Sequence, residues 1–225
     1  MGKEKFSLTQ ADIVALESGD KGYFTDKGAK YYVREAYNKA VDYYRLGAAM
    51  GEVQSISNLG YCYLYGRDIE QNTDLAIAYF KIAALRGNID AAYKLGDIYS
   101  RDKWVKPDKE LAIYYYKQAI AYILDGNIEE ETDVRWVDKL QDYPSLCFAV
   151  GRELFVGGDL NTNLFVSYQL MRHAEKGYKR EIDNGFELYK DAYNSVLEYL
   201  SKEEYNDAKK ELDYEDEEDD WYTIN

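Results

Sequence analysis

The residues that most often do chemistry in proteins are scarce in this chain of 225 residues. It contains one histidine, His173, and two cysteines, Cys62 and Cys147. His173 lies in the segment QLMRHAEKG, where we interpret it as a solvated or core-edge side chain near the C-terminal end of a helix. Both cysteines lie in apolar stretches, which indicates buried, reduced thiols and favours a cytoplasmic protein. This set gives no nucleophile–base arrangement and no ligand set for a metal.

Motifs that bind phosphate or activate a nucleophile are also absent. The sequence contains no GxxxxGK[ST], GxGxxG or GxSxG. Gly157-Gly158-Asp159 is interpreted as a loop, and the many carboxylates as solvated faces of an acidic helical chain. We therefore expect a protein that is not an enzyme and that uses no cofactor and no metal.

The charge of the chain excludes one class of partner. The formal net charge is −14, and no basic stretch of the kind that binds a phosphate backbone is present. We therefore expect no nucleic-acid partner. No run of about 18 apolar residues exists, so no membrane-spanning segment is expected.

The last residues, 211–225, combine acidic and aromatic side chains. Glu211–Asp220 contains eight acids and no base, and Trp221, Tyr222 and Ile224 follow it. One interpretation is a disordered, solubilising end. A second is a short linear motif that binds a basic partner, and a third is that the aromatic side chains fold back onto the last helices. The sequence leaves all three open.

A repeat of 36 residues organises the chain. Ala40, Ala76 and Ala112 open three near-copies of one segment, AVDYYRLGAAMG, AIAYFKIAALRG and AIYYYKQAIAYI. Apolar residues recur in each copy at i, i+3, i+4, i+7 and i+8, the pattern of an amphipathic helix. Upstream, the pair Leu59-Gly60 returns as Leu95-Gly96. A glycine inside a helix costs about 1 kcal/mol against alanine, so its recurrence predicts that a neighbouring helix crosses there. A fixed period in this range predicts stacked helix–turn–helix units.

Local signals mark where these helices begin and end. Gly51 and Gly87 occupy matching positions and predict helix C-caps. Asn72 or Thr73 can cap the start of one second helix, and Pro107-Asp108 suits the first turn of the next.

These residues resemble the Sel1-like repeat family, a relative of the tetratricopeptide repeats. The resemblance is specific over residues 53–122, where the family pattern is met by Ile56, Leu59, Gly60, Tyr63, Gly66, Ala76, Tyr79, Phe80, Ala83, Ala84 and Gly87. It implies an all-α protein, a right-handed α-solenoid of helix–turn–helix repeats. It also implies a bacterial-type scaffold protein.

The flanking regions depart from the repeat. We expect one solenoid over residues 1–210, with clear repeats over about 30–122 and a divergent repeat over 145–177. Residues 126–142 form an insertion with a short helix around 134–140. Closing helices are expected within 183–210, a first helix over 8–16, and an irregular loop over 18–29.

The resemblance also implies a binding surface. In related tetratricopeptide arrays, side chains near the Leu-Gly pair point into a concave groove. Carried onto this sequence, those positions are Ser57, Tyr61, Tyr65, Tyr93, Asp97, Arg101, Phe148 and Arg152. Tyrosines with interspersed charges suit peptide recognition, because the ring gives a large contact area at little entropic cost.

Two functions follow from these expectations. The first is a non-enzymatic scaffold or adaptor that binds a protein or peptide in the concave face. The alternative is an acidic inhibitor, for instance an immunity-type protein that masks a basic enzyme or toxin through its negative surface and its tail.

Overall fold

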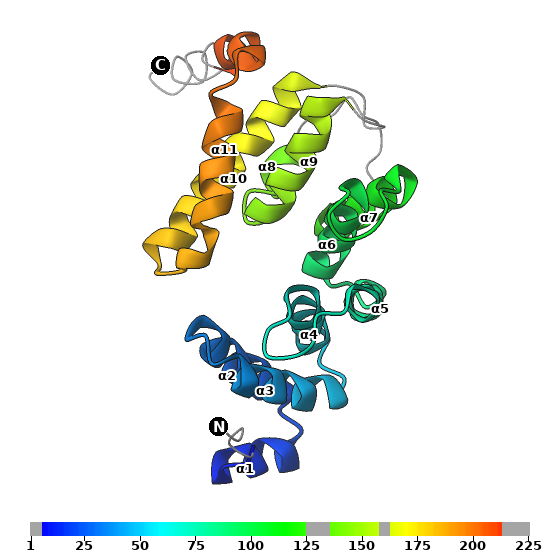
Figure 1. Ribbon diagram of the computed structural model, residues 1–225. Coiled ribbons are helices and arrows are strands. Elements are labelled where there is room, and N and C mark those ends of the chain that lie inside the picture. The colour runs from blue at the N-terminus through cyan, green and yellow to red at the C-terminus, as the bar shows by residue number, and fades with distance from the viewer. Residues whose placement is uncertain (1–5, 125–135, 158–162, 213–225) are drawn as a thin grey trace. The chain divides into compact units, whose positions relative to one another are not determined.

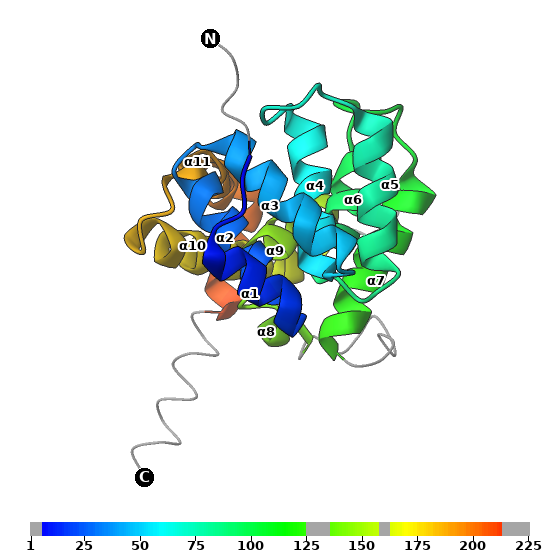
Figure 2. The same cartoon turned by 90° about the horizontal axis from the view of Figure 1, so that it is seen from below.

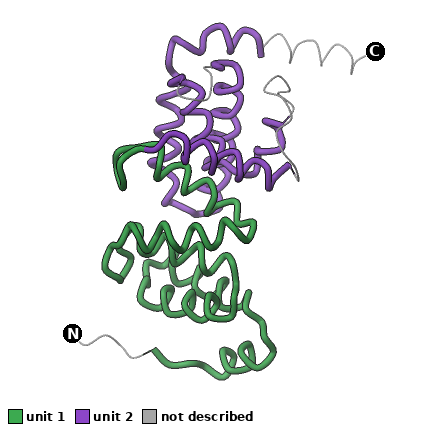
Figure 3. The backbone as a smooth tube through the Cα atoms, turned by 90° about the vertical axis from the view of Figure 1, so that its right-hand side faces the viewer, with its two compact units in different colours: residues 1–107 green, residues 108–225 purple. Residues whose placement is uncertain are grey.

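The computed structural model describes residues 6–124, 136–157 and 163–212, and within these ranges the chain forms helices and no strand. The all-α fold class predicted from the sequence is therefore confirmed. The chain divides into two compact units, Met1–Pro107 and Asp108–Asn225 (Figure 3). Each unit is described below by itself.

The first unit contains six helices (Figures 1 and 2): α1 (Gln10–Ser18), α2 (Lys21–Val33), α3 (Tyr37–Ala49), α4 (Val53–Tyr65), α5 (Thr73–Ala84) and α6 (Ile89–Ser100). Helix α2 packs along α3, α4 packs along α5, and α5 also contacts α6. The aromatic and aliphatic residues of the repeat fill the spaces between them. Phe24, Tyr44, Leu59, Phe80 and Leu95 are all buried.

Capping residues fix the ends of these helices as the sequence predicted. The Asn72 side chain accepts a hydrogen bond from the backbone N–H of Leu75 at 2.9 Å, so Asn72 and not Thr73 is the cap of α5. Asp108 accepts from the N–H of Leu111 at 3.0 Å at the start of the next helix. Gly51 and Gly87 have φ of +78° and +83°, the left-handed conformation that ends a helix.

The recurring mid-helix glycine lies where two helices cross. A Cβ atom added at Gly60 would lie 2.7 Å from Cε1 of the fully buried Phe80. Gly28 of α2 has the same role, because a Cβ there would lie 2.5 Å from Cε1 of Tyr44 in α3. Small residues at these two positions therefore let an aromatic ring of the partner helix approach the backbone.

The predicted irregular loop over residues 18–29 is wrong, because α2 covers most of it. The glycines and charges of this stretch were taken as loop signals. The Asp20 side chain caps α2 by accepting from the N–H of Tyr23, and Gly28 is the crossing glycine. The first repeat therefore has both of its helices.

The second unit contains α7 (Lys109–Leu124), α8 (Trp136–Lys139), α9 (Pro144–Val156), α10 (Leu164–Asp183) and α11 (Lys190–Leu200), with single 3-10 turns at Glu187–Tyr189 and Glu203–Tyr205. Helix α10 lies along α9 and also contacts α8 and α11. Of the insertion at 126–142, α8 and the residues after it are described, and the rest lies outside the described residues.

Helix α10 is longer than the sequence indicated. Gly177 lies inside it, and a Cβ there would lie 2.7 Å from Cβ of Pro144. His173 is consequently in the middle of α10, where its Nε2 lies 3.1 Å from Asp138 Oδ1, so the proposed interaction with a helix C-terminus is wrong. Gly185, at φ +95°, follows the end of α10, and the closing helix α11 begins at Lys190, not near 183.

Buried polar contacts hold the outer elements of each unit. In the first unit, Asp12 of α1 is fully buried and its Oδ1 lies 2.6 Å from Nζ of Lys27 in α2. In the second unit, the Tyr205 and Ser167 hydroxyls lie 2.6 Å apart, and Ser167 donates to the Gly151 carbonyl at 2.6 Å. These contacts attach α1 to its neighbour and the last helical turns to α9 and α10.

Candidate functional site

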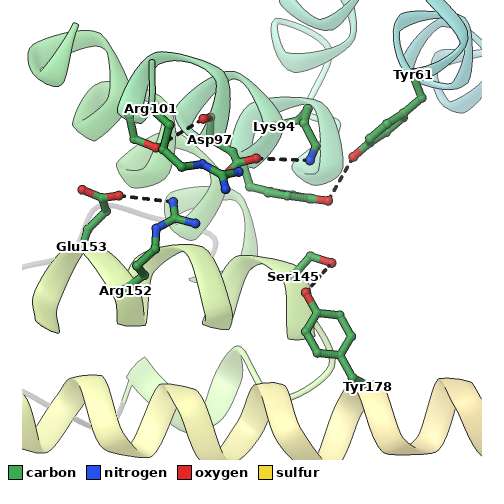
Figure 4. Close-up of polar contacts among 10 residues, drawn as sticks. Tyr61, Lys94, Asp97, Arg101, Ser145, Arg152, Glu153 and Tyr178 are labelled. Carbon is green, nitrogen blue, oxygen red and sulfur yellow. Dashed lines mark hydrogen bonds and ion pairs between the residues drawn. The ribbon is translucent and has the colours of Figure 1, made fainter. Parts of the chain in front are cut away.

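Two tyrosines from neighbouring repeats meet on the face formed by α4 and α6. The hydroxyl of Tyr61 in α4 donates to the hydroxyl of Tyr93 in α6 at 3.0 Å (Figure 4). Both side chains are half-buried. The Tyr61 ring stands edge-on to the buried Phe80 ring at 5.0 Å, so the ring packing at Gly60 also positions Tyr61.

A lysine lies under this pair of rings. Nζ of Lys94 is 5.5 Å from the centre of the Tyr61 ring and 5.2 Å from that of the Tyr93 ring. The same Nζ lies 3.4 Å from Oδ2 of Asp97, whose other carboxylate oxygen pairs with Arg101 (Figure 4). Lys94 and Asp97 are buried, whereas 43% of the Arg101 side chain is exposed. One carboxylate thus serves two cations.

The protonation states of this group follow from its surroundings. Burial disfavours the charge of Lys94, but the neighbouring Tyr93 ring and the Asp97 carboxylate outweigh burial and raise the pKa of Lys94. Burial, helped by Tyr93 and Asp90, raises the pKa of Tyr61 well above its usual value. Lys94 is therefore a cation and Tyr61 a neutral hydrogen-bonding hydroxyl throughout the physiological pH range.

The aromatic surface continues past these residues. Tyr65, one turn after Tyr61, stacks on it at 6.4 Å between ring centres and meets the edge of Trp104 at 5.6 Å. Nζ of Lys103 lies 4.8 Å from the centre of the Trp104 ring. We call the whole group the tyrosine–lysine cluster: Tyr61, Tyr65, Tyr93, Lys94, Asp97, Arg101 and Trp104.

The structure brings together five of the eight predicted surface residues, namely Tyr61, Tyr65, Tyr93, Asp97 and Arg101. Ser57 is on the same helix as Tyr61, but its side chain is fully buried and its hydroxyl has no hydrogen-bond partner in the described structure. A buried side chain cannot contact a partner directly, so we leave Ser57 out of the cluster.

The remaining two predicted residues lie in the second unit. Phe148 of α9 packs edge-on against Tyr178 of α10 at 6.5 Å and against Tyr199 of α11 at 6.0 Å. The Arg152 guanidinium lies 5.8 Å from the Phe148 ring centre and pairs with Glu153 at 3.3 Å. Phe148 therefore contributes mainly to the contact of α9 with the two helices that follow it. The predicted tail motif, Trp221, Tyr222 and Ile224, lies outside the described residues.

Sequence reasoning missed two members of the cluster. Lys94 is next to a predicted residue, but a lysine is seldom assigned to a buried position. Its partner Asp97 at i+3 was the available signal, since opposite charges at that spacing lie on one helix face. Trp104 was passed over as part of a loop, although a large aromatic residue in a polar segment is itself a signal of contact.

Comparison with known proteins identifies the repeat. A family model of the Sel1 repeat matches residues 22–52, 53–88 and 89–121. The chain carries three Sel1 repeats. The first match begins inside α2, in agreement with the structure, and Sel1 repeats are typically protein–protein interaction modules.

Two solved structures are similar to this chain. The Sel1 repeat protein from Oxalobacter formigenes has 16% sequence identity and a TM-score of 0.53 over 76% of this chain and 61% of its own. The protein c5321, a protective antigen in uropathogenic Escherichia coli strains displaying an SLR fold, has 22% identity and a TM-score of 0.47. That alignment covers 76% of this chain and 43% of c5321. The chain therefore spans less than two thirds of either protein. No curated protein matches the sequence significantly.

The first of these similarities supports the fold, which is an all-α solenoid of repeats. Within the described ranges, no group of three or more His, Cys, Asp or Glu residues could hold a metal ion. None of the described helices is long and apolar enough to cross a membrane.

Proposed function

We propose that this chain is a non-enzymatic scaffold or adaptor whose first unit binds a protein or peptide segment at the tyrosine–lysine cluster. The observation that carries the proposal is the pair of tyrosine hydroxyls from successive repeats, held 3.0 Å apart above a buried cation. Ordinary helix packing would be satisfied by apolar residues, because burying a lysine costs free energy unless it is fully paired.

The cluster has the composition of a contact surface. Tyrosine and tryptophan rings on rigid helices give contact area with little loss of side-chain entropy, and such rings are enriched where interfaces are strongest. Arg101 remains partly exposed while paired with Asp97, so it can also bind a carboxylate or a backbone carbonyl of a partner. We expect an extended segment that lies across α4 and α6 and contacts both repeats.

The experiment compares variants of the full chain as affinity baits. Tyr93→Ala removes a ring, Tyr93→Phe removes only its hydroxyl, and Arg101→Glu reverses an exposed charge. Proteins captured from the native host by the wild type should be lost with Tyr93→Ala and Arg101→Glu. Each candidate is then purified and titrated calorimetrically, where we expect about a tenfold or larger rise in Kd for Tyr93→Ala.

Matched controls come from outside the cluster. Tyr114→Ala alters an exposed tyrosine of α7, and Arg172→Glu reverses a charge whose side chain is 44% exposed, close to the 43% of Arg101. Binding that falls equally in these controls, or that survives in the cluster variants, contradicts the proposal. Deletion of residues 211–225 should leave binding at the cluster intact.

A second candidate function is favoured by the charge distribution. Residues 1–107 contain 15 Lys and Arg against 14 Asp and Glu, whereas residues 108–225 contain 13 against 28. An acidic inhibitor that masks a basic enzyme or toxin would use this second part of the chain. Its binding should weaken steeply with added salt and with deletion of 211–225, and it should be insensitive to Tyr93→Ala.

A further inference from the structure

Helix α5 carries an exposed apolar stripe. Leu75, Ile82 and Leu85 are 42%, 45% and 78% exposed, and Ala78 between them is exposed as well. Their spacing of i, i+3, i+7 and i+10 places all four on one side of the helix. The opposite side of α5, with Ala76, Phe80 and Ala83, is buried against α4 and α6 (Figure 2).

The repeat itself does not require this stripe. Thirty-six residues earlier, the positions that match Leu75 and Ala78 are Lys39 and Asp42 of α3. The buried positions, in contrast, match closely: Ala76 and Phe80 correspond to Ala40 and Tyr44. Four apolar residues on the outer side of α5 are thus a property of this repeat alone and indicate a contact beyond the packing of the solenoid.

Basic residues border the stripe on both sides. At 100° per residue, Lys81 lies on one flank of the line through Leu75, Ile82 and Leu85, and Arg86 on the other. Neither cation has a carboxylate within ion-pair distance among the residues that the structure describes. An apolar stripe between two cations suits a segment that carries both apolar and acidic side chains.

We propose that this stripe binds the C-terminal tail of the chain, residues 215–225. The tail has six consecutive acids, 215–220, followed directly by Trp221, Tyr222 and Ile224. Its aromatic side chains match the apolar stripe and its acids match Lys81 and Arg86. The structure describes the chain up to Leu212, and the 13 residues beyond it can span up to about 43 Å when extended. The tail can come from the same chain or from a second copy.

The test uses zero-length cross-linking of the full-length protein. A water-soluble carbodiimide joins a lysine amine to a carboxylate only when the two are in contact, and mass spectrometry identifies the joined peptides. We expect the tail acids to join preferentially to Lys81. Ile82→Asp with Leu85→Asp should lower that yield at least about tenfold, because burial of either side chain is worth a factor of this order.

Matched variants separate docking from simple attraction. Val156→Asp changes an exposed apolar residue in the second unit, 69% exposed, and should leave the Lys81 product unchanged. Trp221→Ala with Tyr222→Ala keeps every tail acid and should still lower the yield. Mixing isotopically light and heavy protein shows whether the tail belongs to the same chain or to a second copy.

Three outcomes overturn the proposal. The tail acids could join the lysines of the last helices, Lys202, Lys209 and Lys210, in place of Lys81. They could join exposed lysines indiscriminately, or the Lys81 product could persist in Ile82→Asp with Leu85→Asp. Tyr93→Ala, which tests the tyrosine–lysine cluster, should not alter the Lys81 product, so the two proposals fail independently.

Discussion

Substitution of Gly60 by alanine should destabilise the first unit, although alanine is the better helix former. Alanine in a helix interior gains about 1 kcal/mol over glycine. At Gly60, however, the new Cβ would lie 2.7, 2.8 and 3.0 Å from three carbons of the Phe80 ring, which is fully buried. Overpacking of this kind costs about 1–3 kcal/mol. We therefore expect Gly60→Ala to lose about 1–2 kcal/mol in the free energy of unfolding.

The control is a second helical glycine with open space around it. A Cβ at Gly22 in α2 would meet only Oδ1 of Asp20, at 3.6 Å. Gly22→Ala should therefore leave stability unchanged or raise it by about 0.5 kcal/mol. Urea titrations followed by far-UV circular dichroism compare the two variants, and thermal scans should separate them by about 2–4 °C for each kcal/mol.

A double-mutant cycle identifies the contact responsible. Phe80→Leu alone should destabilise, because it removes buried ring area. In the Gly60→Ala background, the smaller leucine relieves the overlap, so the two losses should sum to more than the loss of the double variant, by about 1 kcal/mol or more. If the losses are simply additive, or if Gly60→Ala is as stable as Gly22→Ala, the crossing glycine has another cause.

Two further predictions concern the buried polar contacts. Although burial opposes the charge, hydrogen bonds from Lys27 and Thr9 hold the pKa of Asp12 well below its usual range, so its stabilisation is present above about pH 4 and is lost as the pH falls below that value. Asp12→Asn should lose about 1–3 kcal/mol at neutral pH and flatten the acid limb of the stability curve, and an unchanged acid limb would contradict this. Burial raises the pKa of Tyr205 to about 12, so its hydroxyl stays neutral. Tyr205→Phe should lose about 0.5–1.5 kcal/mol and Tyr205→Ala about 3–5 kcal/mol in urea unfolding, and equal losses would show that the Ser167 hydrogen bond dominates over the ring packing.

The sequence predicted the regular part of the fold because the 36-residue period holds there. Helices α3 to α7 follow from the period, the caps and the apolar spacing. The period fails at α2, where only residues 34–36 separate α2 from α3, whereas residues 66–72 separate α4 from α5. The crossing glycine consequently lies 32 residues before Gly60, at Gly28, and a search at a fixed spacing passes over it.

The candidate site was predictable only in part, for a physical reason. Stepping along one helix face by four residues finds Tyr93, Asp97 and Arg101, because such residues share a face. It does not find Lys94, which becomes favourable only when Tyr61 from the preceding repeat supplies a ring above it. It also includes Ser57, whose burial depends on neighbouring helices. Contacts between repeats are long-range in sequence, and a period predicts that they exist but not which side chains make them.

The positions that break the repeat are therefore the most informative about function. Where packing sets the requirement, successive repeats hold similar residues, as with Tyr44 and Phe80 above their crossing glycines. Lys94 occupies the position of Asn58, and Leu75 that of Lys39, so packing within the solenoid does not dictate either residue. Both departures are costly for an isolated protein: one buries a cation and the other exposes apolar area. A partner that contacts the tyrosine–lysine cluster and a tail segment that covers α5 would each recover that cost on binding.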